Sequence, residues 1–150
     1  MALFWLHLAS TLALVGLIWT IQLVHYPLMA RVGADFVAYH SAHCARIAWL
    51  VAPLMGLEAL TSVMLLAQRP AGVSATWAWV GIGLVALIWI ATALLSVPEH
   101  SRLQQGFDAA AVERLVRTNW IRTVAWTVRG VLVVWIAAQW VGSGSSRVAG

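Results

Sequence analysis

The chain has 150 residues, of which 62% are hydrophobic and only 9% are charged. A soluble domain of this length needs more polar surface to cover its core, so the composition excludes that class and predicts one integral membrane domain. The net charge is +4, but the nine basic residues are arginines scattered among apolar segments. This distribution excludes a nucleic-acid footprint and favours membrane lipids as partners.

The first apolar segment covers residues 3–25. Its length exceeds the roughly 20 residues that a helix needs to cross a hydrocarbon core, and no basic segment precedes it. We therefore expect a transmembrane helix rather than a secretory signal peptide. Pro27 follows directly, and because proline lacks an amide donor we expect the helix to end there. His7, near the opposite end of the segment, is interpreted as an ordinary interfacial residue.

The second apolar segment, residues 45–67, follows a connection that is rich in ligating side chains. The stretch "HYPLMARVGADFVAYHSAHCARI", residues 25–47, holds three histidines, the only cysteine of the chain and two arginines. His40 and His43 are three residues apart, a spacing that on a helix allows two imidazoles to reach one metal ion. Cys44 lies about 100° further round the helix than His43. We interpret it as a small packing residue.

The third and fourth apolar segments cover residues 76–97 and 118–141. The connection between them carries Glu99 and His100, and Asp108 is placed to cap a short helix over residues 109–117. We expect this short helix to lie in the plane of the membrane interface. The last residues, 142–150, are rich in glycine and serine and are expected to form a flexible tail.

These segments predict an all-α integral membrane protein, a four-transmembrane-helix bundle over residues 1–141. Lipid offers no partner to backbone N–H and C=O groups, and the alternating pattern of a membrane barrel is absent, so the spans must be helices. Arginines are concentrated in and beside the connections of residues 26–44 and 98–117. The positive-inside rule therefore places both connections in the cytoplasm and both termini outside, as expected for a bacterial inner-membrane protein.

Four of the five histidines are expected at this same membrane face. The predicted metal ligands are His25, His40, His43 and His100. A set rich in imidazole suits iron, copper or zinc better than calcium or magnesium, and metal sites in helix bundles are assembled from facing helices in this way. The alternative is that histidines at a headgroup boundary simply bind phosphate or water.

Two charged residues, Glu58 and Arg129, fall deep within the second and fourth segments, at roughly 20 and 17 Å from the cytoplasmic side. An ion pair between them is expected, because an unpaired buried charge costs several kcal/mol. The pair either fixes how the two helices dock or takes part in substrate or proton chemistry. The polar residues predicted to act on a substrate are Glu99, Asn119, Arg122, Glu58 and Arg129.

The leading functional hypothesis is a membrane-embedded metal-dependent oxidoreductase that acts on a small apolar substrate, such as a lipid, quinone or isoprenoid, at the cytoplasmic side. One alternative is a b-type haem protein that transfers electrons, with two histidines as axial ligands. Another is a non-enzymatic accessory subunit or a small proton-coupled transporter. The sequence is also compatible with a homo-oligomer.

Overall fold

The structure, a computed structural model, describes residues 2–70 and 72–146, with side chains through residue 141. All the regular elements in this part of the chain are helices. Four helical spans are long and apolar enough to cross a membrane: Ala2–Met29, Gly33–Ala67, Ala75–Leu103 and Ala109–Val141. The four apolar segments predicted from the sequence are thus confirmed as helices, and each helix extends beyond its predicted limits on at least one side.

The spans are built from α-helices joined by short turns of other helical types. In chain order the elements are α1 (Ala2–Thr20), the π-helical turn η1 (Ile21–His25), α2 (Tyr26–Met29), the 3-10 turn η2 (Gly33–Asp35), α3 (Phe36–Ala67), α4 (Ala75–Ala91), the π-helical turn η3 (Thr92–Ser96), α5 (Val97–Leu103) and α6 (Ala109–Ser146). Because α6 runs through Ser146, the predicted tail of residues 142–150 begins as helix, and residues 147–150 lie outside the described part of the chain.

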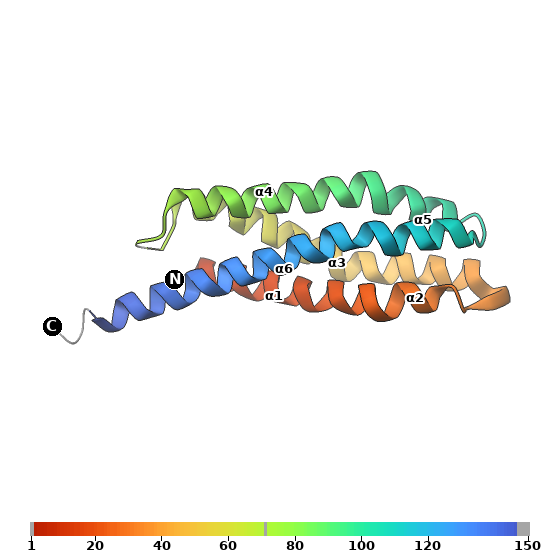
Figure 1. The fold of residues 1–150 in the computed structure, drawn as a ribbon, viewed down its shortest axis with the longest axis horizontal. Helices are drawn as coiled ribbons and strands as arrows, with labels where there is room; N and C mark the ends of the chain where they lie inside the picture. The colour runs from red at the N-terminus through yellow and green to blue at the C-terminus, as the bar shows by residue number, and fades with distance from the viewer. Residues whose placement is uncertain (1, 71, 147–150) are drawn as a thin grey trace.

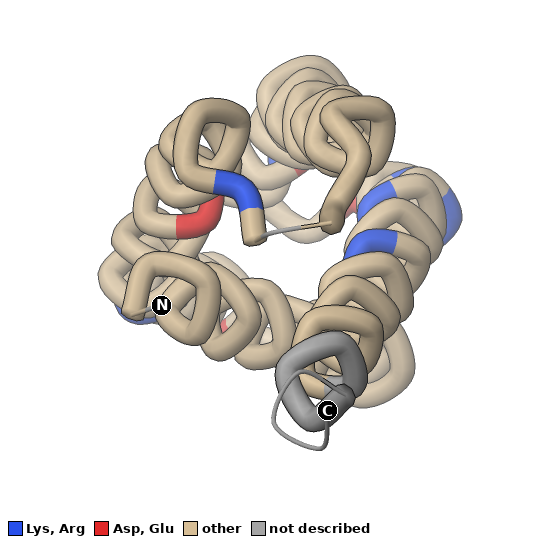
Figure 2. Tube along the Cα trace, turned by 90° about the vertical axis from the view of Figure 1, so that its left-hand side faces the viewer, with Lys and Arg blue, Asp and Glu red and all other residues tan. Residues whose placement is uncertain are grey.

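The spans form an antiparallel up-and-down bundle (Figure 1). Seen along the bundle, each span has two neighbours: α1 packs on α3 and α6, and α4 also packs on α3 and α6 (Figure 2). The start of α1 and the end of α6 lie at one end, which we call the terminal end, together with the end of α3 and the start of α4. The opposite end, which we call the histidine end, holds the connections of residues 30–35 and 104–108.

The first helix continues through Pro27, so the prediction that it ends there is wrong. In η1 the amide of Tyr26 donates to the carbonyl of Ile21, five residues back, and Pro27 then stands in the first turn of α2. Proline is tolerated in a first turn, and the wider π-helical turn before it supplies such a position inside a continuous span. The same arrangement recurs at η3, which precedes Pro98 in α5.

Residues 109–117 are helical, but they form the first turns of α6 rather than a separate interfacial helix. Asp108 caps this helix as predicted, because its Oδ1 accepts hydrogen bonds from the amides of Ala110 and Ala111 at 2.9 and 3.1 Å. Ala111 and Leu115 are fully buried. The segment therefore packs inside the bundle instead of lying along its surface.

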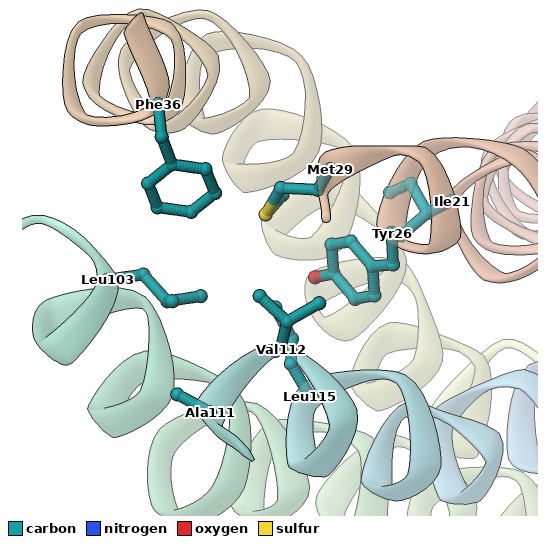
Figure 3. Packing of buried hydrophobic residues seen from close by; sticks show 8 residues of the cluster. All are labelled: Ile21, Tyr26, Met29, Phe36, Leu103, Ala111, Val112 and Leu115. Carbon is teal, nitrogen blue, oxygen red and sulfur yellow. The ribbon is translucent and has the colours of Figure 1, made fainter. Parts of the chain in front are cut away.

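The histidine end is closed by a cluster of packed apolar side chains. The cluster contains Ile21, Tyr26, Met29, Phe36, Leu103, Ala111, Val112 and Leu115, and their side chains point toward one another from the ends of all four spans (Figure 3). Met29 and Leu103 have no exposed surface. The centre of the bundle is therefore filled with packed side chains at this end.

Candidate metal centre and its lateral cavity

Three side chains capable of binding metal meet just inside the histidine end: His40 and Cys44 from α3, and His100 from α5. The Nε2 atom of His40 is 3.0 Å from Nδ1 of His100, and the Sγ atom of Cys44 is 3.7 Å from each of these nitrogens. One donor atom from each residue lies within 4.8 Å of the others. His40 and Cys44 share a face of α3 because they are four residues apart.

These spacings fit the ligand shell of one transition-metal ion. Bonds of about 2.0 to 2.3 Å in a tetrahedral arrangement separate two nitrogens by about 3.3 Å, and a nitrogen from a sulfur by about 3.6 Å. The remaining ring nitrogen of His100, Nε2, lies 3.1 Å from the hydroxyl of Tyr26. Such an outer hydrogen bond orients most metal-binding histidines. Three protein ligands also leave a fourth position open, as catalytic metal sites require.

The other two predicted ligands, His25 and His43, lie beside this group and not within it. Their rings stack on each other with centroids 3.9 Å apart, while the centroid of His43 is 6.4 Å from that of His40 and 6.0 Å from that of His100. A residue three positions after His40 is rotated by about 60° around the helix, whereas one four positions after it is rotated by about 40°. Cys44 thus joins the donor group, contrary to its interpretation as a packing residue.

A cavity of about 420 Å³ adjoins the centre, between α3 on one side and the α4–η3–α5 span on the other. Its polar lining residues include His43, Cys44, Ser96, His100, Gln104 and Arg122. Its apolar lining residues include Ile47, Val51, Met55 and Trp89. The exposed residues of its lining include Ala48, Ala52, Trp89 and Val97, all within spans long enough to cross a membrane. The cavity therefore opens sideways along the bundle, and the exposed Ser101 and Gln104 of its lining extend this opening toward the histidine end.

Arg122 of α6 lines this cavity, as its predicted role requires, and only 6% of its surface is exposed. Its Nη1 donates a hydrogen bond of 2.7 Å to Oγ of Ser96, and the guanidinium lies 5.5 Å from the ring centroid of Trp126 and beside the hydroxyl of Tyr26. The Nε atom is buried and has no hydrogen-bond partner in the described part of the chain. This donor atom is therefore buried and unpaired on a side chain that lines the cavity.

Two further predicted site residues, Glu99 and Asn119, are not among the residues that line the cavity. The carboxylate of Glu99 accepts hydrogen bonds from Nε and Nη2 of Arg114 at 3.0 and 3.1 Å. It faces α6 because neighbouring residues on a helix point about 100° apart, so Glu99 and His100 cannot share a direction. Asn119 is fully buried, and its Nδ2 donates to Oε1 of Gln22 at 2.8 Å.

Glu58 and Arg129 form the predicted ion pair, nearer the terminal end than the metal centre. The Nε atom of Arg129 is 2.7 Å from Oε1 of Glu58, and both side chains are only 1% exposed. Glu58 also accepts hydrogen bonds of 3.0 Å from the hydroxyl of Thr11 and from Nε1 of Trp126. The carboxylate is therefore held by residues of α1 and α6.

The remaining nitrogens of Arg129 are also engaged. Nη1 donates to the carbonyl oxygen of Gly81 on α4, and Nη2 lies 2.5 Å from Oγ of Ser62 and 3.0 Å from Nε2 of His7. His7 is only 4% exposed, so its interpretation as an interfacial residue is wrong. Its other ring nitrogen is 2.7 Å from Oγ1 of Thr61. This network joins all four spans, and each nitrogen of its arginine already has a partner.

The candidate metal centre, the cavity and Arg122 make one continuous site, and the Glu58–Arg129 network is a second, separate polar group. No protein-family model, curated protein or solved structure matches this chain. Function is therefore inferred from the chemistry of these two groups.

Proposed function

We propose that this protein is a membrane-embedded, metal-dependent oxidoreductase acting on a small apolar substrate of the lipid, quinone or isoprenoid kind. One observation carries the proposal: a three-donor group lies on the wall of a cavity that opens sideways. Cys44 and His100 belong both to the donor group and to the cavity lining, so a substrate in the cavity would lie against the metal.

The donor chemistry suits a transition metal, and the proposal takes that metal to be one that changes its oxidation state. Thiolate and imidazole ligands suit iron, copper and zinc, and of these only iron and copper are redox-active. The open fourth position is where an oxidant or substrate atom would bind. Zinc in the centre would support a metal enzyme without redox chemistry, so the identity of the metal decides the reaction class.

The exposed surface of the bundle supports a membrane location. Large apolar side chains are exposed on three different spans, for example Trp49 at 85%, Leu94 at 67% and Val131 at 66%. Such apolar surface is unfavourable in water and normal against lipid. With lipid around the spans, an apolar substrate would enter the cavity laterally. The concentration of arginine favours a cytoplasmic position for the histidine end.

The two alternatives receive less support. The facing nitrogens of His40 and His100 are in direct contact at 3.0 Å. Two axial bonds on opposite sides of a haem iron would separate them by about 4 Å, with a porphyrin plane between the rings. An accessory subunit or a proton-coupled transporter would depend on the Glu58–Arg129 network. The hydrogen bonds of this network are satisfied, which favours a role in docking the helices over a role in proton transfer.

The proposal is tested by the metal content and the spectrum of the purified protein. Wild-type protein, purified in mild detergent without chelators, should contain about one iron or copper ion per chain. Its metal signal should change on chemical reduction and return on exposure to oxygen. A protein that holds no transition metal after reconstitution, or holds only zinc, contradicts the proposed oxidoreductase.

Single-residue variants can show which of two ligand sets binds the metal. One is the three-residue donor group seen in the structure, and the other is the four-histidine set predicted from the sequence. His40→Ala, Cys44→Ala and His100→Ala should each abolish metal binding, because each removes one of three ligands. His43→Ala is the matched control: it removes a neighbouring imidazole and should leave the metal in place. Equal loss of metal in His43→Ala and His40→Ala would instead support the four-histidine site.

A further inference from the structure

Two arginines are buried along α6, and only one of them has a counter-ion. Arg129 is paired with Glu58 at 2.7 Å. Arg122 is 94% buried and, within the described residues, has no carboxylate within 4.0 Å. A buried charge without a partner costs several kcal/mol, and intramembrane charges of this kind usually mark a ligand path. The unpaired arginine is the one that lines the cavity.

The guanidinium of Arg122 also has hydrogen-bonding capacity that the protein does not use. Its Nη1 is held by Ser96, which fixes the orientation of the side chain, while Nε has no partner. An oxygen that carries negative charge forms a stronger hydrogen bond with a guanidinium than a neutral oxygen does, and the Arg122 side chain lines the cavity. The group that completes this site is therefore an acidic oxygen.

The cavity changes from polar to apolar along its length. Arg122, Ser96, His100 and Gln104 line its polar end, and Met55 and Trp89 line its apolar end. Cys44 and Met55 are eleven residues apart on α3, which separates them by about 16 Å. The shape thus fits a molecule with one polar headgroup and an apolar body.

We propose that the cavity binds an amphiphile with a single acidic-oxygen headgroup, whose oxygen docks on Arg122 beside Cys44 and His100. The apolar body extends toward Met55 and Trp89 and leaves past Ala52 into the lipid. As a statement about the substrate class this rests on the proposed function, but the binding itself needs no metal. Two sources supply this chemistry: a fatty carboxylate, or a phenol such as a reduced quinone that binds to Arg122 as its phenolate.

A binding measurement on the full chain in lipid nanodiscs distinguishes these sources. The probes are dodecanoate, para-octylphenol, dodecanol and dodecyltrimethylammonium, each corrected for uptake by empty nanodiscs. Dodecanoate or para-octylphenol should saturate, and the tighter of the two identifies the headgroup. Equal saturable binding of dodecanol or of the trimethylammonium probe overturns the proposal, because neither offers an acidic oxygen.

Variants test the residue that carries the inference. Arg122→Met should weaken binding of the preferred probe about tenfold or more, the expected effect of losing one charge-assisted hydrogen bond. Arg102→Gln is the matched control, since its side chain is 60% exposed at the same end of the bundle and outside the cavity lining. Ala52→Trp should block the opening and abolish binding without changing any charge.

The thermal stability of the variants shows whether Arg122 serves to bind a ligand or to stabilise the fold. Arg122→Met removes an unpaired buried charge, so the melting temperature of the ligand-free protein should stay the same or rise. Arg129→Met should lower it, because it leaves Glu58 unpaired. If Arg122→Met lowers the melting temperature as much as Arg129→Met, Arg122 is a structural residue and the proposal is wrong.

The same binding measurement on His40→Ala separates this inference from the proposed function, because His40 belongs to the donor group and not to the cavity lining. Binding that depends on Arg122 should persist in this variant without metal. If wild-type protein holds no transition metal but still binds the acidic probe through Arg122, the oxidoreductase proposal alone fails. If the metal is present and probe binding does not depend on Arg122, the present inference alone fails.

Discussion

Tyr26 connects the metal centre to the rest of the site at the scale of single residues. Its hydroxyl lies 3.1 Å from Nε2 of His100, and the ring itself is 97% buried in the cluster that closes the histidine end. Rigid packing of the ring fixes the hydroxyl, and the hydroxyl in turn fixes the plane of the imidazole. The geometry of the donor group therefore depends on a residue outside that group.

Tyr26→Phe should weaken metal binding by about 10- to 100-fold while leaving one metal ion bound per chain at saturation, because it removes only the outer hydrogen bond of His100. The measurement is a competition titration against a metal chelator of known affinity. Tyr39→Phe is the control, since the ring of Tyr39 stacks on that of His25 outside the donor group. An unchanged affinity in Tyr26→Phe would mean that His100 is not a ligand.

The Glu58–Arg129 pair gives a second prediction for single residues. Replacing either one by Leu should destabilise the fold by about 3–5 kcal/mol, because the other charge is left buried and unpaired. Replacing both should cost less than the sum of the two single changes. Reversible unfolding in mixed micelles measures the free energies. Additive losses would show that the two charges do not stabilise each other.

The sequence predicts part of this chemistry. It correctly places Glu58 and Arg129 within reach of each other, because both lie at similar depth on helices that can be counted residue by residue. It does not predict that Cys44 lies in the donor group or that His7 is buried, because both depend on how each helix is rotated about its axis. The spacing of four residues between His40 and Cys44 indicates that both lie on one face of the helix. This was overlooked because the spacing of three residues between His40 and His43 also fits a pair of metal ligands.

At the scale of the elements, the spans are predictable and their internal turns are not. Apolar runs of spanning length force helices in lipid, so all four were found from the sequence. Pro27 predicted a break, and instead it follows a π-helical turn that keeps the first span continuous. Pro98 stands in the same arrangement in the third span. The extended α6 was also missed, because the polar residues of 109–117 resemble an interfacial segment until their buried face is seen.

The start of α6 offers a prediction with a control in the same chain. Asp108→Ala should destabilise the protein by about 1 kcal/mol, because the side chain caps two amides of the first turn. Asp108→Asn should retain most of this stability. Asp35 occupies the N-cap position of α3 without a side-chain cap hydrogen bond, so Asp35→Ala should have little effect. Similar melting temperatures for Asp35→Ala and Asp108→Ala would contradict the assigned cap.

For the whole molecule, the histidine end and the terminal end differ in charge. Within the described chain, Arg69 lies beside the end of α3 at the terminal end. Arg31 lies in a connection at the histidine end, and Arg46, Arg102, Arg114 and Arg117 lie in the parts of α3, α5 and α6 nearest that end. Arginine beside a span is retained on the cytoplasmic side during insertion. The metal centre and the polar end of the cavity would then lie in the half of the bundle that faces the cytoplasm.

Two single cysteines on opposite ends test this orientation, in a Cys44→Ser background that removes the native thiol. Gln68 and Gln105 are both exposed, and each lies in or beside a connection at one end of the bundle. With a membrane-impermeant maleimide on intact cells, Gln68→Cys should be labelled at once. Gln105→Cys should be labelled only after the membrane is permeabilised, because the arginines beside it hold that end inside. The reverse pattern would place the histidine end outside the cell, and a substrate in the cavity would then have its acidic headgroup in the outer leaflet.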